Sequence, residues 1–352
     1  MTDLNSGRIL VTGGAGFIGS ALICELNRRG ITNILVSDFL GEEEKWRNLV
    51  PLRFADYVEA DDLLMRLDVS PHLFEDVTAI FHLGACSSTT EANAAYLIRN
   101  NFEYTKALAR FALESGVRFV YASSAATYGC LESCVSESIP LESLRPLNMY
   151  GYSKHLFDCY AERSGILPQI TGLKYFNIFG PNEYHKGDMR SVVHKAFYQI
   201  LETGQVSLFK SYRPEFHHGE QQRDFLYVKD AVSATLYLAE QVDGGGLFNV
   251  GSGQANTWLT LVKAIFSSLG QAPNIKFIEM PDELQDKYQY YTCADITKLR
   301  NAGFTAPMTP LPDTVRDYVL NYLIPDRYLG DEPSEPRVKR HGTAQKEPRS
   351  RA

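Results

Sequence analysis

The chain has 352 residues, of which 44% are hydrophobic and 22% charged, and its formal net charge is −7. This composition is typical of a globular protein, excludes a disordered one, and suits a large α/β domain carrying a smaller one. An acidic surface does not favour nucleic acid as a partner. No apolar run approaches the roughly 20 residues that span a bilayer, and no basic segment precedes the first strand, so we expect a cytoplasmic protein without membrane contact.

The six cysteines form no Cys-x-x-Cys pair and have no histidine at metal-finger spacing. We therefore expect reduced thiols and predict no metal site. Cys130 and Cys134 lie four residues apart in an expected loop, which leaves a redox or metal role open for them.

Short apolar runs alternate with helical stretches along the first half of the chain. The β-branched run 8–12 ends in glycines, a helical spacing follows from Gly19 to Gly30, and 31–37 reads as the next strand. Further apolar runs at 79–83, 118–122 and 170–175 continue this alternation of predicted strands and helices. Alternating β and α units predict a doubly wound parallel sheet of the Rossmann type.

The alternation weakens after residue 180, where a polar stretch with histidines begins. We expect residues 7–180 to form the Rossmann domain, with returning segments near 223–253. Residues 181–222 and 254–325 are expected to form a smaller, interleaved α/β domain for the substrate. Residues 330–352 carry almost no apolar side chains and are predicted to be a disordered tail.

A glycine-rich segment, Gly13-Gly14-Ala15-Gly16-Phe17-Ile18-Gly19, follows the first strand and opens the first helix. Asp38 ends the next strand about twenty residues on, as in a dinucleotide-binding fingerprint. Gly13, Gly16 and Gly19 let the backbone approach a pyrophosphate at the helix N-terminus, so we favour this reading over a purely structural turn. Asp38 favours NAD by repelling a 2′-phosphate, whereas the nearby Lys45 favours NADP, and the cofactor choice stays open.

Tyr150 and Lys154 are four residues apart and therefore lie on one face of a helix. A lysine ammonium beside a phenol is expected to lower the pKa of the phenol, so that the tyrosine can exchange a proton with a substrate hydroxyl. Ser124 follows an apolar strand and is the serine that we expect to bind the reacting oxygen, while Ser123 is the alternative or a turn residue.

Together these residues resemble the extended short-chain dehydrogenase/reductase family, whose members hold NAD(P) in the Rossmann domain and a nucleotide sugar in the smaller one. The resemblance covers about residues 7–325. Four segments make it similar to the heptose 6-epimerases, which make the ADP-heptose precursor of the lipopolysaccharide inner core: FHLGACSSTTE at 81–91, NMYGYSK at 148–154, YFNIFGP at 175–181 and HKG at 185–187.

This resemblance implies a cofactor site and a substrate site. The further cofactor contacts would be Phe17, Ile18, Phe39, Lys45, Leu83, Gly84, Ala85, Cys86, Ser87, Asn100, Lys154, Ile178 and Lys186. The contacts to the ADP-sugar would be Asn177, Asp188, Lys195, Phe209, Lys210, Ser211, Arg223 and Tyr288. The guanidinium fork of Arg223 matches diphosphate oxygens, and a buried structural ion pair is the alternative role.

Lys186 corresponds, by the same resemblance, to a second acid/base. Inverting a carbinol carbon requires hydride to leave one face and return to the other, so the ketone must turn over, and one tyrosine does not reach its oxygen in both poses. Binding of phosphate is the alternative role of Lys186. Three positions depart from the family pattern: Leu83 replaces a frequent Glu, Ala60 a possible NADP-contacting Lys, and Asp188 a small polar residue.

The resemblance therefore implies an isomerase that inverts C6 of ADP-D-glycero-D-manno-heptose by oxidation and re-reduction with bound NADP, NAD being possible. We expect a small-molecule partner and a homo-oligomer. A UDP-hexose 4-epimerase is the nearest alternative, and Lys186 argues against it. A 4,6-dehydratase is disfavoured because Ala125-Ala126 stands in place of the Asp-Glu pair that moves protons in such enzymes. A non-catalytic NAD(P) sensor with the same fold is a further alternative.

Overall fold

The computed structural model describes residues 2–240, 245–285 and 288–331. The tail predicted at 330–352 lies outside these ranges beyond Asp331. None of the helices within them is long and apolar enough to cross a bilayer.

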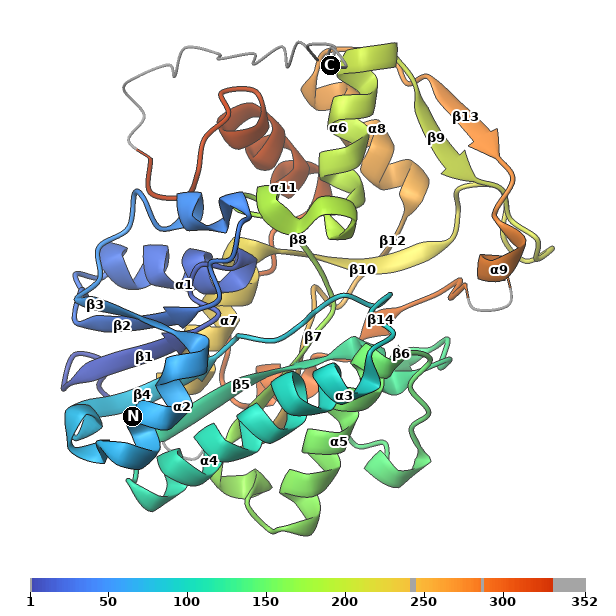
Figure 1. The fold of residues 1–352 in the computed structure, drawn as a ribbon. Helices are drawn as coiled ribbons and strands as arrows, with labels where there is room; N and C mark the ends of the chain where they lie inside the picture. The colour runs from blue at the N-terminus through green and yellow to red at the C-terminus, as the bar shows by residue number, and fades with distance from the viewer. Residues whose placement is uncertain (1, 241–244, 286–287, 332–352) are drawn as a thin grey trace, which may run out of the picture.

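A seven-stranded sheet, parallel throughout, forms the centre of the larger half (Figure 1). Its strands, in spatial order, are β11 (Gly246–Val250), β7 (Thr171–Tyr175), β5 (Arg118–Ser124), β4 (Val77–His82), β1 (Arg8–Thr12), β2 (Ile34–Asp38) and β3 (Asp56–Glu59). From β1 the chain runs outward to β2 and β3, then returns to β4 and continues outward on the other side. This reversal confirms the predicted doubly wound fold, and it places a ligand crevice at the carboxyl ends of β1 and β4.

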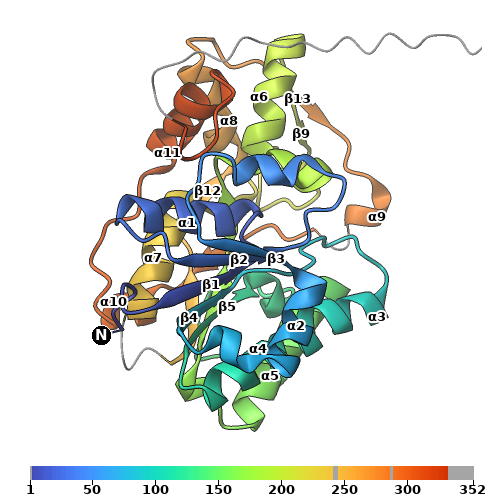
Figure 2. The same cartoon turned by 60° about the vertical axis from the view of Figure 1, so that its left-hand side comes forward.

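Helices cover both faces of this sheet (Figure 2). On one face lie α1 (Phe17–Arg28) and α7 (Val228–Glu240), and on the other α2 (Ala60–Val69), α4 (Tyr104–Glu114) and α5 (Met149–Arg163). Side chains of β1 alternate between the faces: Ile9 and Val11 belong to the core beneath α1, and Leu10 to the opposite core. Two short helices complete this half, α3 (Ala94–Leu97), which runs into α4, and α10 (Thr297–Asn301).

The smaller half lies above the carboxyl ends of the strands (Figure 1). Its helices are α6 (Val192–Thr203), α8 (Trp258–Ser268), α9 (Asp282–Gln285) and α11 (Leu311–Tyr318). Its strands pair in two small sheets: β12 (Ala255–Thr257), β10 (Gln222–Tyr227) and β8 (Asn177–Phe179); and β13 (Ile275–Ile278) and β9 (Val206–Phe209). A further pair, β14 (Cys293–Ala294) and β6 (Cys134–Val135), lies beside the larger half and contributes to the core under α4 and α5. Phe197, Phe266 and Val315 of the smaller half belong to the same hydrophobic cluster as α1 and α7, so the two halves share one core.

The two apolar runs expected to return to the Rossmann domain end in different sheets. Residues 247–250 lie in β11 beside β7 in the large sheet. Residues 225–227 lie in β10, which pairs with β8 and β12 instead. The first helix begins at Phe17, two residues before the predicted Gly19, because Gly16 already occupies the extended N-cap position.

Candidate active site

The glycine turn packs directly against the loop after β4. Gly13 has φ +68°, and a Cβ there would lie 2.5 Å from the backbone nitrogen of Gly84. A Cβ on Gly19 would overlap the carbonyl oxygen of Gly13. Close approach of the backbone therefore requires glycine at both positions, and at Gly13 the left-handed conformation requires it as well.

The N-terminus of α1 fits a phosphate group. Its N-cap, Gly16, supplies no capping side chain, and no acidic residue lies in the first turn. The backbone N–H groups and the helix dipole are therefore available to bind an anion in the crevice between β1 and β4. This arrangement suits the pyrophosphate of a dinucleotide.

Asp38 and Lys45 form one unit at the end of β2. Asp38 is 6% exposed, and its Oδ2 accepts a hydrogen bond from the backbone of Ala15, inside the glycine turn, at 2.9 Å. Lys45 Nζ lies 3.0 Å from Asp38 Oδ1 and also donates to the carbonyl of Phe39 at 2.9 Å. The ammonium thus offsets the charge of the carboxylate next to the position expected for the adenosine ribose.

The loop 84–87 is held by Asn101, which the sequence did not single out. Its side chain accepts from the backbone of Cys86 and donates to the carbonyl of Cys86, both at 2.9 Å, and also donates to Ser153 at 3.0 Å. The predicted contact Asn100 lies beside it and donates to its Oδ1 at 3.2 Å. Asn101 therefore links the predicted cofactor loop to the helix that carries Tyr150 and Lys154.

Tyr150 and Lys154 lie in the first turns of α5, and Ser124 ends β5. A hydrogen bond with Ser124 favours the phenolate form of Tyr150, but desolvation outweighs it and raises the pKa of the phenol. The predicted lowering by Lys154 is therefore wrong for this structure. Lys154 Nζ donates instead to the carbonyl of Ala122 at 2.9 Å, and burial lowers the pKa of the ammonium to about 8.

The two candidate serines have different surroundings. Ser123 is 2% exposed, and its hydroxyl donates to the buried carboxylate of Asp158 at 2.7 Å. Ser124 lies close enough to Tyr150 to favour its phenolate form, and its Oγ accepts from the backbone of Ala126 at 3.1 Å. This arrangement favours Ser124 as the residue that contacts the reacting oxygen.

Lys186 approaches the cofactor region from a 3₁₀ turn, Tyr184–Met189, in the smaller half. Its Nζ lies 5.2 Å from the ring centroid of Phe17, at the start of α1. Burial lowers the pKa of Lys186, and the charge of Glu183 opposes this shift. Glu183, which the sequence analysis missed, is fully buried and accepts hydrogen bonds from Ser191, which anchors the turn.

Arg223 and Tyr288 come together around a third residue, Trp258. The Arg223 guanidinium carbon lies 5.1 Å from the ring centroid of Tyr288 and 5.7 Å from that of Trp258, whose indole N–H donates to Tyr288 at 2.9 Å. Arg223 is 8% exposed, and within the described ranges no carboxylate lies within ion-pair distance of it. A buried, aromatic-flanked cation without a counter-ion argues against the structural ion pair and is suited to an anionic ligand.

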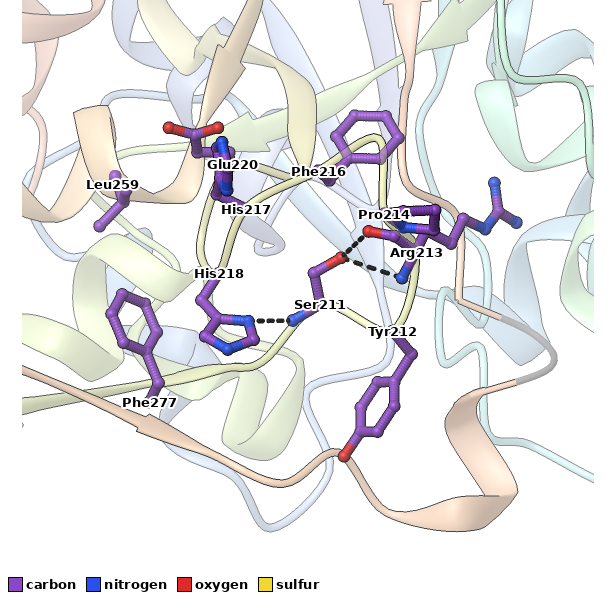
Figure 3. A pocket seen from close by; sticks show the side chains of 10 residues that line it. All are labelled: Ser211, Tyr212, Arg213, Pro214, Phe216, His217, His218, Glu220, Leu259 and Phe277. Carbon is purple, nitrogen blue, oxygen red and sulfur yellow. Dashed lines mark hydrogen bonds between the residues drawn. The ribbon is translucent and has the colours of Figure 1, made fainter.

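The other predicted substrate contacts on the smaller half are dispersed. The ring of Phe209 meets Tyr288 edge to face, with centroids 6.5 Å apart, while Lys210 forms an exposed ion pair with Glu279. Ser211 lines a pocket of about 670 Å³ (Figure 3). There its backbone N–H points at His218 Nδ1, 3.0 Å away. The pocket contains neither Tyr150 nor Arg223, so we do not place the reacting sugar in it.

Four further predicted contacts, Asn177, Ile178, Asp188 and Lys195, lie on or after β8. Asn177 is exposed and Ile178 half-buried at β8, whose backbone pairs with β10. Lys195 donates to the backbone carbonyl of Asp188 at 2.6 Å, and both residues are exposed. No side-chain contact in the described ranges links this exposed pair to Arg223.

The cysteine next to Cys134 is Cys293, not Cys130. The Sγ atoms of Cys134 and Cys293 lie 3.3 Å apart where β6 and β14 pair. Both are free thiols, and burial raises the pKa of Cys293 to about 12. Because Cys134 and Cys293 lie 159 residues apart in the chain, the sequence did not indicate that they are neighbours.

Known proteins resemble this chain over most of its length. Residues 9–251 match the family described as "NAD dependent epimerase/dehydratase". The ADP-L-glycero-D-manno-heptose-6-epimerase of Nitratidesulfovibrio vulgaris (strain DP4) is 49% identical over 315 residues, covering 89% of this chain and 97% of that protein. The protein of that name from Fusobacterium nucleatum subsp. nucleatum is 44% identical, covering 91% of this chain and 100% of the relative.

A solved structure supports the same assignment. The crystal structure of Helicobacter pylori ADP-L-glycero-D-manno-heptose-6-epimerase superposes with a TM-score of 0.76 and 27% identity, covering 91% of this chain and 97% of that one. The glycine turn, the parallel sheet and these matches agree, and the chain belongs to the NAD-dependent epimerase/dehydratase family.

Proposed function

We propose that the chain interconverts ADP-D-glycero-D-manno-heptose and ADP-L-glycero-D-manno-heptose by oxidation and re-reduction at C6. The observation that carries the proposal is the grouping of Ser124, Tyr150 and Lys154 at the same sheet edge as the glycine turn, in a chain 49% identical to a relative of that name. The product would be a precursor for synthesis of the lipopolysaccharide inner core.

Each residue of this group has a defined task. The chemistry that a nicotinamide dinucleotide would supply when bound is reversible transfer of the C6 hydride. Tyr150 would take the proton of the C6 hydroxyl as the ketone forms, while the Ser124 hydroxyl holds the oxygen. Lys154, fixed by the carbonyl of Ala122, places a positive charge beside the phenol and favours its ionised state during transfer.

Inversion requires a second group that serves the oxygen after the ketone has turned over, and we assign this role to Lys186. Its ammonium lies against Phe17 at the start of α1, and burial brings the pKa of this lysine down toward the working range. Arg223, between Tyr288 and Trp258, would hold the diphosphate and so keep the sugar in the site while its ketone turns over.

We propose NADP as the cofactor, with NAD as the alternative. Lys45 supports NADP because its ammonium, 3.0 Å from Asp38, offsets the carboxylate that would repel a 2′-phosphate. Ala60 and Leu83 supply no further charge for that phosphate. We also propose that the protein is a cytoplasmic homo-oligomer. Its domain boundaries are proposed as above, with residues 181–222 and 254–325 binding the substrate.

The test uses purified protein, ADP-D-glycero-D-manno-heptose and NMR of the C6 configuration. We expect interconversion without net reduction of added nucleotide. Mass spectrometry of the nucleotide that co-purifies distinguishes NADP from NAD. Loaded protein that leaves the C6 configuration unchanged would show that the proposed reaction is wrong.

A further inference from the structure

The last three residues of β5 each make a contact that matters for the proposed reaction. The carbonyl of Ala122 accepts from Lys154 Nζ at 2.9 Å, Ser123 donates to Asp158 at 2.7 Å, and Ser124 lies close enough to Tyr150 to favour its phenolate form. The position of this strand end relative to α5 therefore sets the relation between the serine, the tyrosine and the lysine.

Asp158 is the residue that joins the strand end to α5. It is fully buried and lies four residues after Lys154, one helical turn along. Its carboxylate accepts from the hydroxyl of Tyr121 at 2.9 Å, from Ser123 at 2.7 Å and from Lys174 Nζ at 2.8 Å. Strands β5 and β7 and helix α5 are thus tied together at one carboxylate.

Lys174, on β7, is the counter-ion of Asp158, and its side chain is 1% exposed. It also donates to Thr127 Oγ1 at 2.6 Å, and Thr127 in turn donates to the carbonyl of Ser124 at 2.8 Å. Stability alone does not account for this pair, since a buried ion pair is often replaceable by apolar side chains of similar volume without loss. Its placement around the strand end points to a task in the site.

We propose that Asp158, charge-balanced by Lys174, is a positioning residue that holds the end of β5 against α5 and keeps Lys154 charged. The proposal rests on the proposed function of Tyr150 and Lys154. Asp158 itself touches neither substrate nor cofactor.

The charges around Lys154 agree with this role. Burial lowers the pKa of Lys154 to about 8, and the negative charge of Asp158 and the thiol of Cys86 oppose the shift. The remaining charged or ionisable groups nearby are Lys174, which balances Asp158, Tyr150 on the same helix, and His82 at the end of β4. Burial depresses the pKa of His82 well below its usual value, so that it is neutral. Asp158 is thus the main fixed anion that favours the ammonium.

The experiment compares pH profiles of kcat for C6 epimerisation. Removing both charges in the double variant Asp158→Asn/Lys174→Met avoids an unpaired buried charge. Without the Asp158 charge the pKa of Lys154 falls further, so we expect the alkaline limb of the kcat profile to move to lower pH by about one unit, with KM nearly unchanged.

A second variant tests the positioning part without changing any charge. Ser123→Ala removes the bond between Asp158 and the strand end, and we expect kcat to fall about tenfold with the alkaline limb in place. The matched control is Asp317→Asn on α11, in the smaller half, which breaks the ion pair with Lys229 on α7 (2.6 Å). It should lower the melting temperature without moving the pH profile.

Lys154→Met separates failure of the inference from failure of the proposed function. If Lys154→Met abolishes turnover but neither other variant changes kcat or the alkaline limb, Asp158 is only a structural residue and the inference is overturned. If Lys154→Met retains full turnover, the proposed role of the Tyr150–Lys154 pair is itself wrong.

Discussion

Replacing Arg223 by Met tests whether this buried cation serves the ligand or the fold. In a bidentate contact with a diphosphate the guanidinium makes two charge-assisted hydrogen bonds, which are worth about 3 kcal/mol together, or about 100-fold in KM. The contact persists from the ground state to the transition state, so kcat should change little.

The same change should leave stability intact. Arg223→Met gives up two cation–π contacts and a hydrogen bond to the carbonyl of Gln222 at 2.8 Å, worth about 3 kcal/mol in total. It also removes a buried charge that has no carboxylate partner in the described ranges, and burying such a charge costs several kcal/mol. We therefore expect an unchanged or higher free energy of unfolding, measured by thermal or urea denaturation, beside a raised KM in the C6 epimerisation assay.

Arg118→Met, at the start of β5 and away from the carboxyl ends of the strands, is the matched control. Arg118 donates to Thr171 Oγ1 at 2.9 Å and to the carbonyl of Leu238 at 2.8 Å, so its loss should cost about 3 kcal/mol of stability and leave KM alone. Were Arg223→Met as destabilising as Arg118→Met, with KM unaltered, the ligand-binding role of Arg223 would be refuted.

Three further substitutions test the cofactor half of the site. Tyr150→Phe should lower kcat by about 10²–10⁴-fold while the nucleotide still co-purifies; normal turnover would exclude Tyr150 as the proton-transfer group. Gly19→Ala should abolish co-purification of the nucleotide, because the added methyl overlaps the carbonyl oxygen of Gly13, whereas Gly30→Ala, with open space around its Cβ position, should only lower stability by about 1 kcal/mol. Lys45→Ala should weaken NADP binding about tenfold relative to NAD, measured by calorimetry, and equal losses for both would contradict the assignment of Lys45 to the 2′-phosphate.

The cofactor half of the site was predictable from the sequence because its signals are local. Gly13 to Gly19 follow one strand, and Asp38 ends the next. In a parallel sheet, neighbouring strands place such carboxyl-terminal residues at one edge. Four-residue spacing likewise placed Tyr150 and Lys154 on one helix without any tertiary information.

The residues that the sequence did not reveal act across long separations. Trp258 reaches Tyr288 from α8, and Asn101 reaches the loop at Cys86 and then Ser153. These contacts depend on how the elements pack, which no local pattern encodes. The direction of the Tyr150 pKa shift was mispredicted for the same reason: desolvation depends on three-dimensional enclosure, whereas only the neighbouring charge of Lys154 was visible in the sequence.

Desolvation shifts the pKa values of Tyr150 and Lys186 in opposite directions, and these directions suit the two proton transfers of the proposed mechanism. Desolvation raises the pKa of Tyr150, so that its phenolate is a stronger base for the hydroxyl proton, and it lowers the pKa of Lys186, so that its ammonium is a stronger acid toward the oxygen of the turned-over ketone. After one passage the two groups have exchanged protonation states, so the site must be reset before the next substrate of the same configuration. This reset requires proton exchange between each group and solvent. Under the proposed mechanism, a proton path from Tyr150 and Lys186 to solvent is therefore as necessary for turnover as the burial that sets their pKa values apart.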